Sequence, residues 1–136
     1  MSEKKIYDAS EANSLFQNDR YAMKTSGIVV VEVGEDFAKC RMDIDDRHLN
    51  ANNVVMGGAI FTLADFTFAV ASNYNTVPTV TLSSQIQYIG AARGKTLYSE
   101  LKMIKNGKRN CFCEITVTDE NENRIAFVTT VGAHLV

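Results

Sequence analysis

Residues 57–72, GGAIFTLADFTFAVAS, decide the fold of this chain. Their length and their small and apolar side chains predict a helix whose single charged residue is Asp65. The helix is apolar on nearly all sides, so more than one of its faces must be covered by other parts of the protein. Fewer than about 18 residues, interrupted by a carboxylate, are too few to cross a bilayer, and we expect no membrane contact.

Strand patterns flank this helix on both sides. Residues 28–33 are rich in β-branched side chains, and residues 38–44 alternate apolar and polar after a turn at 34–36. Residues 45–55 are polar and aperiodic, which predicts a loop. After the helix, the same alternation predicts three or four further strands joined by short turns, within residues 80–88, 97–103, 111–118 and 125–135.

Two local signals complete the outline. Asp8 or Ser10 can cap a short amphipathic helix within residues 8–21. Asn106 and Gly107 predict a two-residue type I′ hairpin. The order of a helix, two strands, a long helix and further strands predicts an α+β domain with a curved antiparallel sheet around one side of the long helix. We expect a second copy of the chain to cover the remaining faces of that helix.

Composition narrows the classes of function. The 136 residues are enough for one domain, residues 1–136, and 46% hydrophobic residues with one proline exclude a disordered or fibrous chain. A formal net charge of −2 argues against a nucleic-acid-binding surface, which needs an excess of Lys and Arg. The polar beginning, MSEKKIYDASEANS, predicts no secretory signal, and an odd number of cysteines suits a reducing cytoplasm.

The sequence also lacks the common metal and cofactor motifs. Cys111 and Cys113 are spaced for neither a zinc knuckle nor a disulfide, and with Cys40 they fall on apolar strand faces. His48 and His134 have no carboxylate or cysteine at metal-ligand spacing. There is no G-x-S-x-G elbow, no G-x-G-x-x-G and no P-loop. We therefore expect neither a metal nor a cofactor.

Asp65 shares its helix face with Phe61, Thr62, Phe68 and Ala69. Apolar neighbours remove water from a carboxylate, which raises its pKa and its basicity. Because a desolvated carboxylate is costly, such a residue usually has a partner or a chemical task. The alternative is an ordinary aspartate at a solvent-facing gap in the helix, and the sequence leaves both open.

Met56, Gly57 and Gly58 mark the start of the helix. The first-turn amides have no intrahelical acceptor, and the helix dipole puts partial positive charge there. Glycine lets a ligand approach the backbone closely, so these amides can hold an oxyanion that develops on a carbonyl. A flexible junction between loop and helix is the alternative for the same residues.

The carboxylate and the glycine pair are too far apart to act together within one helix. Asp65 lies eight residues after Gly57, which is roughly 12 Å along the helix axis. A base and an oxyanion donor must each lie about 3 Å from their reacting atoms. Two antiparallel helices across a two-fold axis would bring Gly57 of one chain to Asp65 of the other, which predicts a dimer with two shared sites.

One motif resembles a known family. It runs through His48-Leu-Asn50, the glycine pair and Asp65, and it is followed by the strand VTLSSQIQY and Gly94. The pattern resembles the hot-dog fold acyl-CoA thioesterases of the phenylacetate-pathway (PaaI-like) group, from about Ser26 to the end of the chain. In that family a long helix is wrapped by an antiparallel sheet, the active sites lie at a dimer interface, and dimers often pair into tetramers.

The resemblance implies a role for each residue of the motif. Asp65 would be the catalytic carboxylate, as general base on water or as nucleophile, and the Gly57 amide would polarise the thioester carbonyl. Asn50 would position the water or the carboxylate. Further residues would line the substrate site: His48, Met56, Gly58, Thr81 and Ser83, the last two placed on one strand face by strict alternation.

Two positions depart from the family pattern. The family usually has His where this chain has Met56, and a neutral Met neither donates a hydrogen bond nor takes a proton. Activity or substrate preference would differ if that His orients the loop or the substrate, whereas Met would substitute well if it only packs. Ala92, near where the family often has Pro, is a minor change in turn stiffness.

The substrate contacts are less specific. Phe61, Leu63 and Phe68 are candidates for an acyl pocket, although their helix positions suit the core equally well. Short basic clusters at loop ends can contact the phosphates of coenzyme A, or they can be ordinary solvated turn residues; these are Arg93 with Lys95, and Lys105 with Lys108 and Arg109.

The sequence therefore predicts an acyl-CoA thioesterase, homodimeric or homotetrameric, that releases a free acid and coenzyme A. A non-catalytic acyl-CoA-binding module on the same fold is the rival, with Met56 as a sign of lost chemistry. Asp65 and Asn50 argue against that rival, because binding alone does not require a costly carboxylate. A hydratase or dehydratase on this fold usually carries a different Asp/His arrangement.

Overall fold

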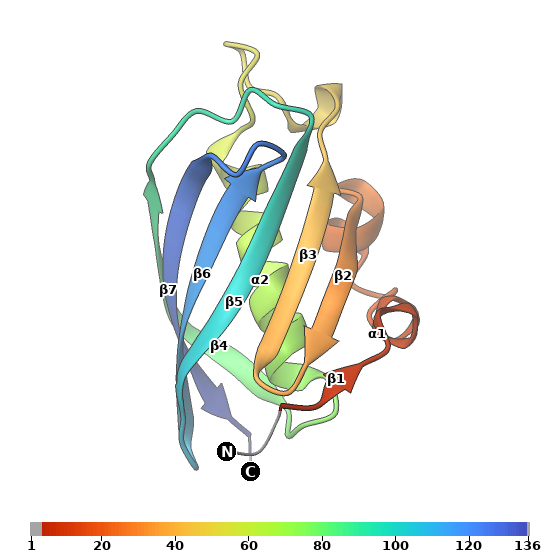
Figure 1. The fold of residues 1–136 in the computed structure, drawn as a ribbon, viewed down its shortest axis with the longest axis vertical. Helices are drawn as coiled ribbons and strands as arrows, with labels where there is room; N and C mark the ends of the chain where they lie inside the picture. Colours follow the sequence, from red (N-terminus) through yellow and green to blue (C-terminus); the bar gives the residue numbers. More distant parts are fainter. Residues whose placement is uncertain (1–3, 136) are drawn as a thin grey trace.

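The computed structural model describes residues 4–135 and places one curved antiparallel sheet around a long helix (Figure 1). In this part of the chain the seven strands follow the order β1-β2-β3-β5-β6-β7-β4. Their bounds are Ile6–Tyr7, Ile28–Gly34, Phe37–Asp43, Thr79–Tyr88, Thr96–Asn106, Asn110–Asp119 and Arg124–His134 for β1 to β7. The predicted α+β architecture, with the sheet wrapped around the helix, is confirmed.

The long helix α2 spans Gly57–Asn73, as the sequence predicted. Neither it nor any other described helix is long and apolar enough to cross a membrane. Leu63 and Phe68 are fully buried, and Phe68 lies so close to Gly132 of β7 that a Cβ there would be 2.6 Å from its ring. These two candidates for an acyl pocket are therefore core residues, whereas Phe61 is only partly buried.

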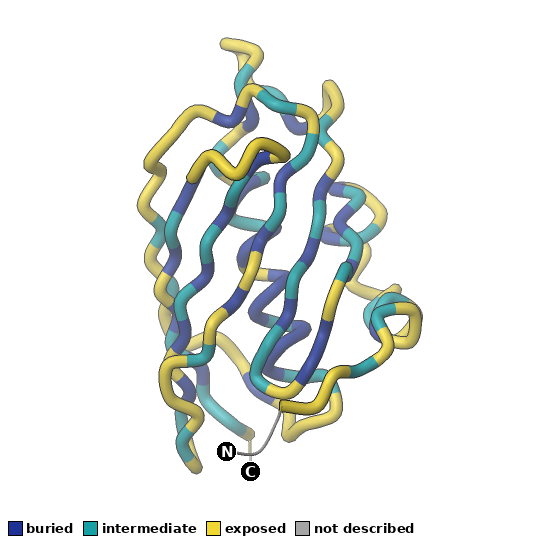
Figure 2. Tube along the Cα trace, in the orientation of Figure 1, coloured by how far each residue is buried: buried dark blue, intermediate teal, exposed yellow. Residues whose placement is uncertain are grey.

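Burial alternates along the strands as the sequence pattern predicted, which Figure 2 shows as a change of colour from residue to residue. On β6, Cys111, Cys113 and Ile115 face the helix and are buried, while Phe112 between them is exposed. Cys40 on β3 is buried in the same core, and none of these cysteines forms a disulfide. The prediction of core cysteines is confirmed.

The N-terminal segment covers a side of α2 that the sequence left for a second copy. Its helix α1, Ala9–Leu15, is shorter than predicted and is capped by the Asp8 side chain. A π-helical turn at Tyr21–Thr25 follows it. Phe16 packs edge-on against Phe66 of α2, with 6.0 Å between ring centroids. The N-terminal segment therefore covers part of the helix surface that the sequence pattern had left to a second copy of the chain.

One stripe of α2 remains open after this packing. Its members recur every three to four residues, so they share a face of the helix, and each is exposed or only partly buried: Gly58, Phe61, Thr62, Asp65 and Ala69. The candidate carboxylate lies in the middle of this stripe.

The β5–β6 hairpin differs from the type I′ turn predicted at Asn106 and Gly107. Asn106 is the last residue of β5, and its side chain hydrogen-bonds to Asp36 in the turn between β2 and β3 and to His134 at the end of β7. The Gly107 N–H donates to the Asn110 carbonyl at 2.8 Å, so Lys108 and Arg109 form the tip. Neither tip residue has the positive φ of a type I′ turn. The prediction was wrong because β5 and β6 pair in a register that places Asn106 opposite Cys111, which moves the tip by two residues.

Candidate active site

The start of α2 presents two backbone donors that have no partner among residues 4–135. Met56 is the N-cap, and its carbonyl accepts from the N–H groups of Ala59 and Ile60 at 3.0 and 3.2 Å. Among the described residues, no backbone carbonyl accepts from the N–H of Gly57 or Gly58. These first-turn amides can therefore stabilise negative charge on an incoming oxygen, as the sequence predicted.

His48 holds the loop that leads into the helix. It is 3% exposed; its Nδ1 accepts from the Asp45 N–H at 3.0 Å, and its Nε2 donates to the Ser26 carbonyl at 2.7 Å. Its own carbonyl accepts from the Met56 N–H at 2.8 Å. Both ring nitrogens are thus hydrogen-bonded to the backbone of the same chain, so the ring holds this loop in place, and the substrate-binding role of His48 stays a prediction.

Asn50 shapes the turn before the glycine pair. Its Oδ1 accepts from the N–H groups of Asn52 and Val54 at 2.9 and 3.2 Å. The residue is exposed, and no described residue accepts from its side-chain NH2 group. That group remains available to a substrate carbonyl or to a water molecule.

Asp65 lies in a shallow hollow of about 280 Å³ that it lines together with Asp19, Arg20 and Tyr21. No described residue donates a hydrogen bond to its carboxylate or forms an ion pair with it. Although the residue is exposed in the single chain, partial burial raises the pKa of the Asp65 carboxyl, and the negative charge of Asp19 raises it further. The predicted direction of the shift is confirmed, but the sequence did not indicate the part played by Asp19.

Asp65 and the glycine amides do not meet within one chain. The hollow beside the helix start is a separate one of about 110 Å³, lined by Ser26, His48, Met56 and Gly58 among others. Two turns of α2 separate it from the carboxylate, as the helical rise requires. A site that uses both groups still needs a second chain, and this remains a prediction.

Thr81 and Ser83 do not share a strand face. In the pairing of β4 with β7, Thr81 lies opposite Gly132 and Ser83 opposite Val131, with a bulge between them. Directly opposed residues point to the same face, and consecutive residues of β7 point to opposite faces. Thr81 therefore faces the helix side and Ser83 the outer side. The prediction from alternation was wrong because the bulge inserts one residue.

Ser84 takes the inward position that the sequence assigned to Ser83. Its hydroxyl lies 2.9 Å from the hydroxyl of Thr130 on β7, and Thr130 is buried. A β-bulge leaves no mark in the alternation of TLSSQ, so the sequence offered no signal for this exchange.

The basic clusters lie at opposite ends of the sheet. Arg93 follows Ala92, whose carbonyl accepts from the Val55 N–H at 3.2 Å, so it is near the start of α2. Lys108 and Arg109 lie beyond the other end of β5, whose eleven residues span roughly 33 Å. Within one chain, the two clusters cannot both contact the phosphates of the same coenzyme A. The cluster with Arg93 is the one near the glycine amides.

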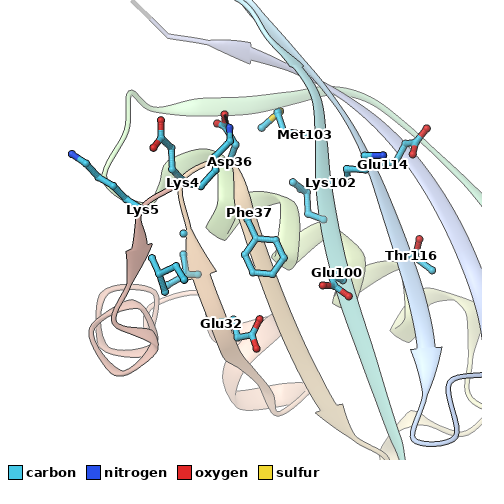
Figure 3. A pocket seen from close by; sticks show the side chains of 15 residues that line it. Lys4, Lys5, Glu32, Asp36, Phe37, Glu100, Lys102, Met103, Glu114 and Thr116 are labelled. Carbon is cyan, nitrogen blue, oxygen red and sulfur yellow. Dashed lines mark hydrogen bonds and ion pairs between the residues drawn. The ribbon is translucent and has the colours of Figure 1, made fainter. Parts of the chain in front are cut away.

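A groove of about 890 Å³ lies away from these residues, on the outer face of the sheet. Figure 3 shows Phe37, Glu100, Lys102 and Glu114 side by side across it, from β3, β5 and β6. None of the predicted catalytic residues lines it. Within residues 4–135, no group of three or more His, Cys, Asp or Glu side chains is arranged to hold a metal ion.

Comparison with known proteins identifies the family. The family model of the thioesterase superfamily matches residues 52–126, which include the glycine pair, Asp65 and strand β4. The chain belongs to the thioesterase superfamily. The family that the sequence motif resembled is thus confirmed.

Individual relatives agree with this family. A "Putative esterase" of Archaeoglobus fulgidus is 36% identical over 98 residues, which cover 71% of this chain and 64% of that protein. The acyl-coenzyme A thioesterase PaaI of Escherichia coli is 28% identical over 116 residues, covering 85% of this chain and 82% of that one. This chain thus matches about two thirds of the length of the first relative and most of the second.

A solved structure confirms the fold. The E. coli PaaI protein from the phenylacetic acid degradation operon superposes with a TM-score of 0.82 at 22% identity. The superposition covers 95% of this chain and 97% of that one. The predicted hot-dog fold, a long helix wrapped by an antiparallel sheet, is therefore confirmed.

Proposed function

We propose that this chain hydrolyses the thioester bond of an acyl-coenzyme A. Water supplies the oxygen of the released acid, the carbon–sulfur bond breaks, and a proton goes to the coenzyme A thiolate. The proposal is carried by one observation: the amides of Gly57 and Gly58 and the partly buried carboxylate of Asp65 have no hydrogen-bond partner within the described part of the chain. Family membership supports the reaction class.

In the proposed mechanism, the amides hold the carbonyl oxygen of the thioester. Their partial charges stabilise the oxyanion as it forms, without a metal ion. Asp65 either removes a proton from the attacking water or attacks the carbonyl itself, and its raised pKa makes it a stronger base in both cases. The side-chain NH2 of Asn50 is free to orient the water or the carbonyl.

We further propose that each site is shared by two chains. β4 is a sheet edge of ten residues, and most of its side chains are exposed, including Leu82 at 61%. A long edge strand that exposes apolar side chains such as Leu82 would invite pairing with another chain. If β4 pairs with β4 of a second copy around a two-fold axis, the open stripes of the two α2 helices lie antiparallel, and Asp65 of one chain approaches Gly57 of the other.

The higher assembly and the location are parts of the same proposal. Lysine and glutamate side chains both line the outer groove, so that face can meet a second copy of itself in a tetramer. Three free, buried cysteines suit a reducing cytoplasm. Light scattering at several protein concentrations separates monomer, dimer and tetramer.

Met56 gives the alternative function a specific basis. Its side chain is 57% exposed beside the amides, where the family usually has a His, and it makes no capping hydrogen bond. A thioether cannot replace a donor or a base. If the missing imidazole is essential, the chain binds acyl-CoA without cleaving it, and the assay below decides between the two functions.

The assay is release of free thiol from short-chain, medium-chain and aromatic acyl-CoAs. We expect turnover by the wild type and a loss of about 10²-fold or more in Asp65→Asn. Asp46→Asn, on an exposed 3-10 turn near the helix start, is the matched control and keeps the wild-type rate. Acyl-CoA binding without thiol release by the wild type would establish the binding module instead, and a fully active Asp65→Asn would remove Asp65 from the mechanism.

Mixed dimers test whether the site is shared. Chains carrying Asp65→Asn are refolded or co-expressed with chains carrying Gly57→Val, each inactive by itself. A mixed dimer then has one site with both wild-type groups, so random mixing restores roughly a quarter of the wild-type rate. If both groups come from one chain, mixing restores no activity.

A further inference from the structure

Tyr88 makes a contact with the helix start that its place in the sequence did not indicate. It is the last residue of β4, and its hydroxyl donates to the Gly57 carbonyl at 2.8 Å. Thirty-one residues separate the two, so only the fold brings them together. In the alternating pattern of residues 80–88, Tyr88 falls among the apolar positions, yet it is 52% exposed.

The contact fixes the direction of a backbone donor. The peptide bond is planar and trans, so the Gly57 carbonyl and the Gly58 N–H lie in one rigid unit and point in opposite directions. Anchoring that carbonyl orients the Gly58 N–H. The Gly57 N–H lies in the preceding peptide unit, whose Met56 carbonyl is anchored by the N–H groups of Ala59 and Ile60. Each of the two free donors is thus held through the other end of its own peptide.

The same contact explains the glycine at position 57. A Cβ on Gly57 would lie 2.9 Å from the Tyr88 hydroxyl and 3.0 Å from Cζ of the ring. A Cβ on Gly58 would meet only the end of the Met56 side chain, at an ordinary 3.5 Å. Any side chain at position 57 must therefore push the tyrosine away, whereas one at position 58 need not.

We propose that Tyr88 is a positioning residue for the oxyanion site: its hydroxyl holds the Gly57–Gly58 peptide so that the Gly58 N–H points at the thioester oxygen. The inference rests on the proposed thioesterase function. Tyr88 does not touch the substrate in this role. It acts through the peptide, and a hydrogen bond to the carbonyl also polarises the N–H of the same unit.

The first test is Tyr88→Phe, which removes only the hydroxyl. Loss of one neutral hydrogen bond is expected to lower kcat about 5-fold to 10-fold. KM and the melting temperature should change little, because the ring stays in place and the bond is exposed. Tyr98→Phe is the control. Tyr98 lies on β5, where the ammonium of Lys39 packs over its ring, and loss of its hydroxyl should leave kcat unchanged.

A double-mutant cycle separates positioning from a general structural effect. Gly57→Ala displaces the Tyr88 hydroxyl, so Tyr88→Phe should have little further effect in that background. In Gly58→Ala, where the tyrosine keeps its contact, Tyr88→Phe should lower kcat by the same factor as in the wild type.

Three results would overturn the proposal for Tyr88. They are a wild-type kcat in Tyr88→Phe, an effect confined to KM, and the same fold-loss in the Gly57→Ala background as in the wild type. Each of them leaves the thioesterase function standing, because the wild type still turns over. If the wild type releases no thiol from any acyl-CoA, both proposals fall together.

Discussion

Replacing His48 by Ala should both destabilise the protein and slow the reaction. The ring is 3% exposed, and its removal leaves the Asp45 N–H and the Ser26 carbonyl without their partners. Each unpaired buried group costs about 1–3 kcal/mol. Water can reach the site through the small hollow at its edge, which favours the lower part of that range for each group. The expected loss is therefore about 2–4 kcal/mol in the free energy of unfolding.

Thermal unfolding followed by circular dichroism measures this loss. For a domain of this size, 1 kcal/mol corresponds to about 3–4 °C, so the melting temperature should fall by about 6–16 °C. Protein concentration is kept fixed, because association shifts the apparent stability. Asp46→Asn, two residues away and exposed, serves as control and should stay within about 2 °C of the wild type.

The same variant tests what His48 does for the reaction. Because the His48 carbonyl anchors the Met56 N–H, a loosened loop should lower kcat more than it raises KM. A melting temperature within 2 °C of the wild type would refute the assigned hydrogen bonds. A normal kcat with a strongly raised KM would show that the ring contacts the substrate directly.

Three further predictions follow from single contacts. Asp19→Asn removes a negative charge that helps to raise the pKa of Asp65. Because the ionised carboxylate is the active form, activity falls as the pH drops through that pKa, and the acid limb of kcat/KM in Asp19→Asn should therefore move to lower pH. An unchanged pH profile would contradict this. Gly132→Ala puts a Cβ 2.6 Å from Phe68 Cζ and 2.8 Å from Cys111 Sγ, and this overpacking should lower stability by about 1–3 kcal/mol in urea titration, whereas Gly58→Ala should not lower it. Arg93→Ala should raise KM for acyl-CoA and weaken its salt dependence, while Lys108→Ala changes neither if the coenzyme A phosphates lie at the Arg93 end.

Most of the fold follows from local patterns in the sequence. Residues 57–72 form α2 almost to the residue, and the alternation in residues 111–117 puts its cysteines and aliphatic side chains in the core. Local patterns failed where register decided the outcome. The bulge in β4 turned Ser83 outward, and strand pairing moved the β5–β6 tip from Asn106 and Gly107 to Lys108 and Arg109. The bulge is set by pairing of β4 with the distant strand β7, which no short window of sequence contains. The hairpin tip is set by the register of β5 with β6 along their whole length, which the two residues Asn106 and Gly107 do not determine.

The candidate site divides in the same way. The sequence by itself determined the helix, the glycine pair at its start and the lone carboxylate on its face, because helical periodicity fixes which residues share a face and how far apart they lie. Only the tertiary structure showed that the His48 ring is hydrogen-bonded to the backbone, that Asp19 lies beside Asp65 and that the Tyr88 hydroxyl donates to the Gly57 carbonyl. Those contacts join segments 22, 46 and 31 residues apart, and their geometry depends on how the sheet curves around the helix.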